Sequence, residues 1–272
     1  MAQRKPYGTL DVTVRDAIGI VTMNRPDVHN AFNDTVIAEL TRAARELEKD
    51  ETVRAVILAG NGPSFCAGAD LNWMKKMAGY GRDENVADAA DLAEMLRTWN
   101  ELRKPTLARV HGAAYGGGVG LVACCDIAIA AAEATFALSE AKLGLIPATI
   151  SPYVIEAIGT RHARRYFLTA ERFEAAEAYR IGLLHDIVPL AQLDDRVNEI
   201  LGPLLIAGPQ AQLECKALIR AVAGRPIDNA VIADTVKRIA DVRGSPEGRE
   251  GVAAFLGKRA APWIPEELRK KR

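Results

Sequence analysis

The sequence predicts an α/β fold with a helical C-terminal region. Residues 54–74 and 106–125 each contain an apolar β-rich run, a glycine-rich turn and the start of a helix. Beyond residue 194 the chain shows only helical patterns, separated by proline and glycine signals. A chain of 272 residues is long enough for one large core with such an extension. We therefore divide it into an α/β core, residues 1–193, and a helical region, residues 194–272.

The composition of the sequence excludes several classes of protein. The 35 basic and 35 acidic residues give a formal net charge of zero, so no overall field attracts nucleic acid or an anionic membrane. No run approaches the roughly 20 apolar residues of a membrane span, and the charged N-terminus lacks the apolar segment of a secretory signal. The four cysteines have neither metal nor disulfide spacing. We expect a cytoplasmic protein that binds no metal, nucleic acid or membrane.

Alternation and capping signals predict the first elements. Residues 10–15 and 18–23 alternate around a short turn, which indicates a β-hairpin. Pro26 ends the second strand, and Asn33 or Asp34 caps a helix whose apolar residues recur at helical spacing.

The middle of the chain continues as strands and helices. Residues 56–58 predict a buried strand, residues 70–77 a short helix and residues 84–102 a long amphipathic helix that Pro105 ends. A strand at 106–111 follows. Further on we expect strands at 127–131 and 135–138, and helices that begin at Ser151 and Thr160.

Gly116, Gly117 and Gly118 follow the predicted strand at 106–111 and permit backbone angles and close approaches that other residues do not. They precede a compact apolar helix at 119–125, so they lie at the helix end whose free N–H groups favour negative charge. One such turn could serve packing alone. The second turn, within 54–74, makes a pair of backbone donors that could hold one carbonyl oxygen.

Glu140 is a candidate acid or base. It follows the predicted strand at 135–138 and precedes the apolar loop 143–147. Partial burial would raise the pKa of its carboxyl group and allow proton exchange near neutral pH. The alternative is a glutamate that caps a helix or pairs with Lys142.

Five motifs in this order resemble the crotonase (enoyl-CoA hydratase/isomerase) superfamily. They are NRPDVHNAF, FCAGADL, GAAYGGG with CDIAIA, FALSEAKLGLIP and GVAAFLGKR, and they span nearly the whole chain. The resemblance implies a crotonase-type spiral of ββα units that binds an acyl-CoA thioester, with a C-terminal helical trimerisation region. It also implies a homotrimer or homohexamer and no separate cofactor, because coenzyme A is part of the substrate.

The resemblance also implies roles for single residues. The N–H groups of Ala69 and Gly117 would form an oxyanion hole, and Glu140 would be one of two acid/base glutamates. Gly120 stands where the second glutamate is expected, so Glu140 must move both protons or another group must help. The residues expected to contact coenzyme A are Asp27, Val28, Asn30, Ala67, Asp70, Leu71, Phe255 and Lys258.

The missing side chain at Gly120 is expected to leave room for a second carboxylate on the substrate. Lys75, Lys76 or an arginine of the stripe at 161–165 would supply the opposite charge. Three residues of the helix at 70–77 would either line an acyl pocket or pack in the core, namely Trp73, Met74 and Met77.

We expect an acyl-CoA lyase that hydrates an enoyl-CoA. In detail the motifs are most similar to methylglutaconyl-CoA hydratases of bacterial leucine and isovalerate breakdown, or to isohexenylglutaconyl-CoA hydratases of terpene breakdown. One alternative is a double-bond isomerase with a single glutamate, and another is a catalytically silent thioester-binding relative. A third is RNA binding, known for an animal member with a lysine-rich helix. The corresponding helix here balances Arg42, Arg45 and Lys49 with four acidic residues.

Overall fold

The computed structural model describes residues 6–269 and shows two compact units. The first ends at Val197 and the second begins at Asn198, and Arg103–Pro105 also belongs to the second. The boundary lies inside α7 (Leu193–Ile206) rather than between residues 193 and 194.

The first unit contains a six-stranded sheet in the order β1-β2-β3-β4-β6-β9. β1 and β2 form the predicted antiparallel hairpin, with Leu10 opposite Met23, and the other neighbours are parallel. The strands are β1 (Leu10–Arg15), β2 (Ile18–Met23), β3 (Ala55–Gly60), β4 (Thr106–Val110), β6 (Ile127–Ala131) and β9 (Asp186–Val188). A smaller sheet contains β5 (Ala113–Tyr115), β7 (Thr135–Ala137) and β8 (Arg172–Glu174), in that order.

Three successive units run through both sheets. β3 is followed by Cys66, which forms a parallel bridge with Ala114 of β5. β4 is followed directly by β5, and β6 by β7. The order β3-β4-β6 in the large sheet is therefore repeated as Cys66-β5-β7 in the second layer. This is the ββα spiral expected from the sequence. It brings three turns together at one end of the second layer: two glycine-rich turns and one turn that contains an acidic residue.

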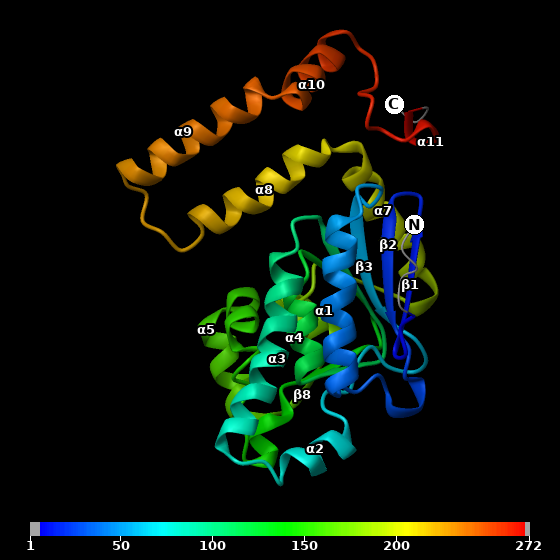
Figure 1. Cartoon of the computed structure of the whole chain (residues 1–272), viewed down its shortest axis with the longest axis vertical. Helices are drawn as coiled ribbons and strands as arrows, with labels where there is room; N and C mark the ends of the chain where they lie inside the picture. The colour runs from blue at the N-terminus through cyan, green and yellow to red at the C-terminus, as the bar shows by residue number, and fades with distance from the viewer. Residues whose placement is uncertain (1–5, 270–272) are drawn as a thin grey trace. The chain divides into compact units, whose positions relative to one another are not determined.

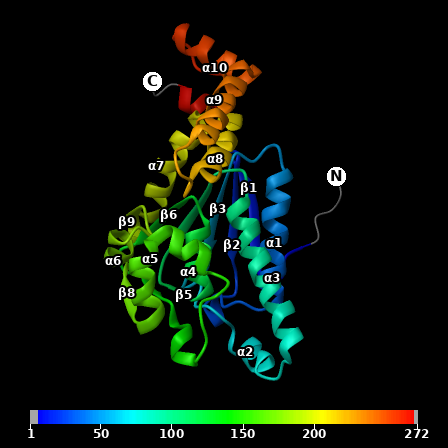
Figure 2. The same cartoon turned by 90° about the vertical axis from the view of Figure 1, so that its left-hand side faces the viewer.

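Two long helices cover one face of the large sheet. α1 (Asp34–Lys49) begins where predicted, because the Asn33 side chain accepts a hydrogen bond from the Val36 N–H at 3.0 Å. α3 (Arg82–Glu101) lies beside α1 in both views (Figures 1 and 2). It begins two residues earlier than predicted, because the Gly81 N–H donates to the Glu84 carboxylate at 2.8 Å.

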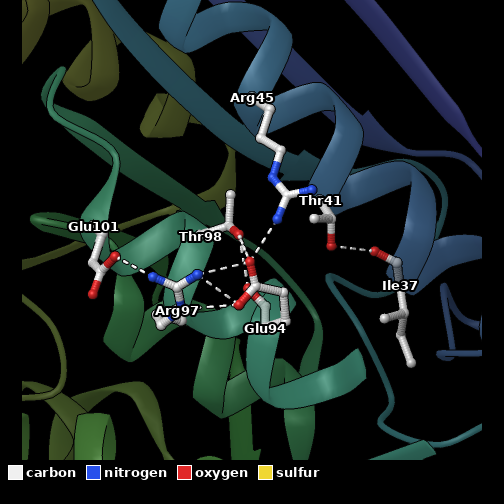
Figure 3. Close-up of polar contacts among 7 residues, drawn as sticks. All are labelled: Ile37, Thr41, Arg45, Glu94, Arg97, Thr98 and Glu101. Carbon is white, nitrogen blue, oxygen red and sulfur yellow. Dashed lines mark hydrogen bonds and ion pairs between the residues drawn. The ribbon is translucent and has the colours of Figure 1, made fainter. Parts of the chain in front are cut away.

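A charged network joins α1 to α3 (Figure 3). The Glu94 carboxylate accepts from Arg45 of α1 at 2.5 Å and from Arg97 of its own helix at 2.7 Å. Arg97 also donates to Glu101 at 2.8 Å. All four side chains are partly exposed, so the network contributes modestly to stability, but it fixes the Arg45 guanidinium on the protein.

The remaining elements of the first unit are short, except for α5 (Ser151–Thr169), which bends at Gly159, where the backbone has φ 71° and ψ 159°. The others are η1 (Pro26–Val28), α2 (Leu71–Met77), α4 (Gly117–Cys124), η2 (Ser139–Leu143), α6 (Ala175–Arg180) and η3 (Leu190–Gln192).

The second unit is helical, as the sequence predicted. Its helices after α7 are α8 (Pro209–Val222), α9 (Asn229–Gly244), α10 (Pro246–Leu256) and α11 (Glu266–Arg269). Ala254, Ala261 and Ile264 form a small core, and the indole N–H of Trp263 donates to the Ile206 carbonyl at 3.1 Å. Across residues 6–269, no helix combines the length and apolar character needed to cross a bilayer.

The expected space at Gly120 is absent. A Cβ atom placed on Gly120 would lie 2.3 Å from Cγ2 and 2.8 Å from Cβ of Ile150, and 3.4 Å from Cδ2 of Leu96. The prediction that this glycine makes room for a substrate carboxylate was therefore wrong. Glycine is required here because α4 packs closely against Ile150 and α3, and a glutamate would have to displace both.

This packing predicts a stability effect. Gly120→Ala should lower the free energy of unfolding by about 1–3 kcal/mol through overpacking, and Ile150→Ala by about 2–5 kcal/mol through a cavity. The double variant should lose at least about 1 kcal/mol less than the sum, because removing Cγ2 of Ile150 relieves the clash. Urea denaturation measures all three.

Gly244→Ala is the matched control, because nothing lies within 4 Å of a Cβ atom placed there. It should leave stability within about 1 kcal/mol of the wild type. Strict additivity of Gly120→Ala and Ile150→Ala would contradict the packing described.

Candidate active site

Two glycine turns meet in the second layer of the spiral. Gly68 and Gly116 have φ values of 93° and 50°, in the left-handed region that favours glycine. A Cβ atom placed on Gly116 would lie 3.9 Å from the Cα atom of Gly68. The turns are therefore in close contact, as two donors to one oxygen require.

Each of these glycines precedes a predicted donor. The Phe32 N–H donates to the Gly68 carbonyl at 2.7 Å, and the Asp70 N–H donates to the Phe32 carbonyl at 2.8 Å. These bonds hold the chain on both sides of Ala69 and leave its own N–H group unused. Gly117 is the first residue of α4, where a helix has no internal acceptor for the N–H. Within residues 6–269 neither amide donates a hydrogen bond, so both are available to an oxyanion.

All three central glycines have a structural reason. Gly116 supplies the left-handed turn. A Cβ atom on Gly117 would lie 2.5 Å from the Phe32 ring, and one on Gly118 would lie 2.5 Å from the Cys66 carbonyl oxygen. Side chains at these positions would push the two turns apart.

The Glu140 side chain faces the glycine turn at Gly116. It lies in η2, directly after β7, and the Gly116 N–H donates to the carbonyl of Ala137 at the end of that strand, at 2.8 Å. A Cβ atom on Gly116 would lie 3.1 Å from Oε1 of Glu140. The carboxyl group therefore points at the glycine turn and not toward Lys142, the alternative partner.

The carboxyl group of Glu140 is poised for proton exchange. Its Oε2 atom is buried and has no hydrogen-bond partner among residues 6–269. Burial raises the pKa of this carboxyl group above its ordinary value of 4.5, although the residue's own backbone N–H acts in the opposite direction. A buried carboxyl group with a raised pKa beside two free N–H groups is suited to acid/base chemistry on a bound carbonyl compound.

Two residues expected to contact coenzyme A have other roles. The Asn30 side chain is 1% exposed; its oxygen accepts from the Arg25 N–H, and its amide donates to the carbonyls of Asn61 and Ser64. Asp70 is 6% exposed, binds Arg25 at 2.9 Å and caps α2. The polar side-chain atoms of both residues therefore hold the fold together, and the contact of these residues with coenzyme A stays a prediction.

The other predicted contact residues remain accessible in part. Asp27, Val28 and Leu71 are exposed, and Ala67 is half-buried and donates its N–H to the His29 carbonyl at 3.0 Å. Phe255 and Lys258 lie at and just beyond the end of α10 in the second unit, and both are exposed.

The helix after Ala69 has one buried and one exposed face. Trp73 is buried and donates its indole N–H to Asp88 of α3 at 3.0 Å, and Met77 packs against the core. These two residues therefore pack in the core rather than line an acyl pocket. Leu71 and Lys75, one turn apart, are on the exposed side.

Arg25 and Phe32 also shape the site, although no sequence pattern indicated them. The Arg25 guanidinium bridges the Ala31 carbonyl and the Asp70 carboxylate, at 2.6 and 2.9 Å. The motif NRPDVHNAF contains both residues, but nothing in it shows that they contact the segment at 68–70. A groove of about 920 Å³ between α1, α2 and α3 is lined by Lys76 but by none of the residues predicted to be catalytic or to contact coenzyme A.

Comparison with known proteins agrees with this geometry. The family model described as enoyl-CoA hydratase/isomerase matches residues 13–266. A crystal structure of an enoyl-CoA hydratase from Shewanella pealeana is 42% identical and has a TM-score of 0.92, over 94% of this chain and 96% of that one.

Two relatives extend the likeness. The probable enoyl-CoA hydratase echA8 of Mycobacterium bovis is 36% identical over 93% of this chain and 97% of its own. The crotonyl-CoA hydratase of Syntrophomonas wolfei is 31% identical over 95% of this chain and 98% of its own. With an oxyanion site and a buried glutamate on a ββα spiral, the chain belongs to the enoyl-CoA hydratase/isomerase family of the crotonase superfamily, as an enzyme of the enoyl-CoA hydratase type.

Proposed function

We propose that this enzyme hydrates an enoyl-CoA thioester, with Glu140 as the only acid/base side chain. The observation that carries the proposal is the buried, unpartnered Oε2 atom of Glu140 beside Gly116. The N–H groups of Ala69 and Gly117 would bind the thioester carbonyl oxygen. They would stabilise the negative charge that develops there, an effect typically worth about 10²–10³ in rate per donor.

One carboxylate can complete the reaction in two steps. The Glu140 carboxylate accepts a proton from water while the water oxygen bonds to C3. The C2=C3 electron pair becomes the C1=C2 bond of an enolate, and the carbonyl electron pair moves onto the oxygen. The enolate then collapses, and C2 takes the proton from Glu140. The net result is addition of one water molecule, with the glutamate regenerated. No second carboxylate at position 120 is needed, and no cofactor beyond the coenzyme A of the substrate is required.

Isomerisation is the second candidate, because a single carboxylate also suffices to move a proton between C2 and C4. A panel of 2-enoyl and 3-enoyl thioesters, analysed by chromatography of the products, separates the two reactions. A hydratase forms 3-hydroxyacyl thioesters from 2-enoyl substrates, whereas an isomerase interconverts the two enoyl compounds without adding water.

The surroundings of the site favour catalysis over silent thioester binding and over RNA binding. A silent thioester-binding relative would not need a buried carboxyl oxygen without a partner beside two free N–H groups. For RNA binding, α1 would have to offer its cations, but Arg45 pairs with Glu94, and Arg42 stacks on Tyr7 and lies 3.6 Å from Glu39. The phosphate contacts that dominate RNA affinity would have to compete with these pairs.

The acyl group we propose is a glutaconyl type, such as methylglutaconyl or isohexenylglutaconyl. Leu71, which is 74% exposed, follows the donor Ala69 closely, and Lys75 lies on the same face of α2 about 6 Å farther along. An apolar contact followed by a cation fits an acyl chain that ends in a carboxylate.

Lys75 is the cation we propose for this role. Within the described residues it makes no hydrogen bond or ion pair. Lys76 donates to Asp34 at 2.6 Å, and Arg165 of the arginine stripe pairs with Glu171 at 2.8 Å. These two cations already have carboxylate partners.

We also propose a homotrimer or homohexamer formed through the helical region. α9 exposes Ile232, Val236 and Ile239 at helical spacing on one side, and exposed apolar stripes of this kind are typical of interfaces. Phe255 and Lys258 would reach the coenzyme A bound to a neighbouring subunit in such an assembly.

Glu140→Gln tests the central role. It should lower kcat for hydration by about 10²–10⁴, with the KM little changed, because the near-isosteric amide cannot exchange protons. Since the carboxylate is the form that accepts a proton, wild-type kcat/KM should rise with pH through the raised pKa of Glu140, above 4.5. Stopped assays across pH measure both. Retention of more than about a tenth of the wild-type kcat would remove Glu140 from this role.

The same variant should be more stable than the wild type at neutral pH. The folded protein binds the Glu140 proton more tightly than the unfolded chain, because the pKa is raised above 4.5. Its contribution to stability is therefore complete below pH 4.5 and is lost as the pH rises through the folded pKa. The urea midpoint of Glu140→Gln should exceed that of the wild type at pH 7, and the two should converge near pH 4. An equal difference at both pH values would show that burial of the charge is not the cause.

Lys75→Met should raise the KM for methylglutaconyl-CoA by about tenfold or more, the typical value of a charge-assisted contact. Activity on crotonyl-CoA should stay within about twofold, since that substrate has no distal carboxylate. Lys76→Met is the matched control, with the same change of charge on the same helix, and should alter neither KM. Equal effects of Lys75→Met on both substrates would contradict the assignment.

A further inference from the structure

Phe32 contacts the segments of both proposed oxyanion donors. Its N–H donates to the Gly68 carbonyl at 2.7 Å, and its carbonyl accepts from the Asp70 N–H at 2.8 Å. The main chain of Phe32 therefore holds Ala69 from both sides, in a single parallel bridge.

The Phe32 ring packs against Gly117, the residue that carries the other donor. A Cβ atom placed on Gly117 would be 2.5 Å from Cε2 and 2.8 Å from Cδ2 of this ring. The ring is 1% exposed and belongs to the core of the first unit. Because it is rigid and packed, it sets how closely Gly117 can approach the strand pairing that carries Ala69.

The Arg25 side chain forms a further link between the two segments that contain Phe32 and Ala69. Its guanidinium donates to the Ala31 carbonyl at 2.6 Å, one residue before Phe32, and to the Asp70 carboxylate at 2.9 Å, one residue after Ala69. The Arg25 and Asp70 side chains are only 20% and 7% exposed. Through Arg25, the residue before Phe32 is also tied to the residue after Ala69.

We propose that Phe32 is a positioning residue that sets the separation of the Ala69 and Gly117 N–H groups. The proposal rests on the oxyanion role of these amides in the proposed function. Stabilisation by two preorganised donors depends steeply on their placement, and an error of about 1 Å can cost about a hundredfold in rate. The Phe32 ring touches no reacting atom and acts only through Gly117.

Phe32→Leu tests the ring alone, because any side chain keeps the two main-chain hydrogen bonds. It should lower kcat by about tenfold to a hundredfold while the KM for crotonyl-CoA changes less than about threefold. Phe173→Leu is the matched control: this ring is also buried, stacks on Phe136 and lies tilted against Tyr166. It should reduce stability with kcat nearly intact.

The carbonyl stretching frequency of a bound, unreactive acyl-CoA gives a readout that lost stability does not move. In the wild type it should shift downward from the free thioester, because two N–H groups polarise the carbonyl. Phe32→Leu should return it toward the free value, and Phe173→Leu should not. A wild-type shift that Phe32→Leu leaves unchanged overturns the positioning role but not the proposed function. No shift in the wild type overturns both.

Gly117→Ala provides a second test at the same contact. Its methyl group would press on the Phe32 ring and should lower kcat by about a hundredfold or more. Adding Phe32→Leu removes the ring, so the double variant should be at least about tenfold more active than the product of the two single effects. Multiplying effects would show that the contact does not couple the two residues and would overturn the proposal.

Discussion

The close contact of the two glycine turns is the constraint on which the site depends. Gly68 and Gly116 lie so near each other that a Cβ atom on Gly116 would be 3.9 Å from Gly68 and 3.1 Å from the Glu140 carboxylate. Each successive unit of the spiral thus delivers one group. The first brings the Ala69 N–H, the second the Gly117 N–H and the third Glu140. The fold produces the site by stacking equivalent turns.

Local signals were enough to predict much of the fold. The hairpin of β1 and β2 follows from alternation, and the start of α1 follows from the Asn33 cap. The left-handed turn at Gly116 also follows from its immediate neighbours. In each case the residues that decide the structure lie within a few positions of one another.

The errors came from contacts between distant segments. Gly120 was expected to leave space, but Ile150 fills it. The side-chain amide of Asn30 donates to the carbonyls of Asn61 and Ser64, a structural role that was not expected. No local pattern marks such partners, because they depend on how the turns of the spiral stack. The roles of Arg25 and Phe32 were missed for the same reason.

Within residues 6–269, the site contains polar groups that the fold leaves without hydrogen-bond partners. Asn30, Asp70 and Arg25 look functional by residue type, yet all of them are occupied by other parts of the chain. The groups left open are two backbone N–H groups and one carboxylate oxygen. An unpaired buried polar atom such as Oε2 of Glu140 costs about 1–3 kcal/mol, so it persists only because the partnered residues around it fix the backbone. Backbone donors have no residue signature in the sequence. The polar side chains that position these amides are therefore easily taken for the functional groups themselves.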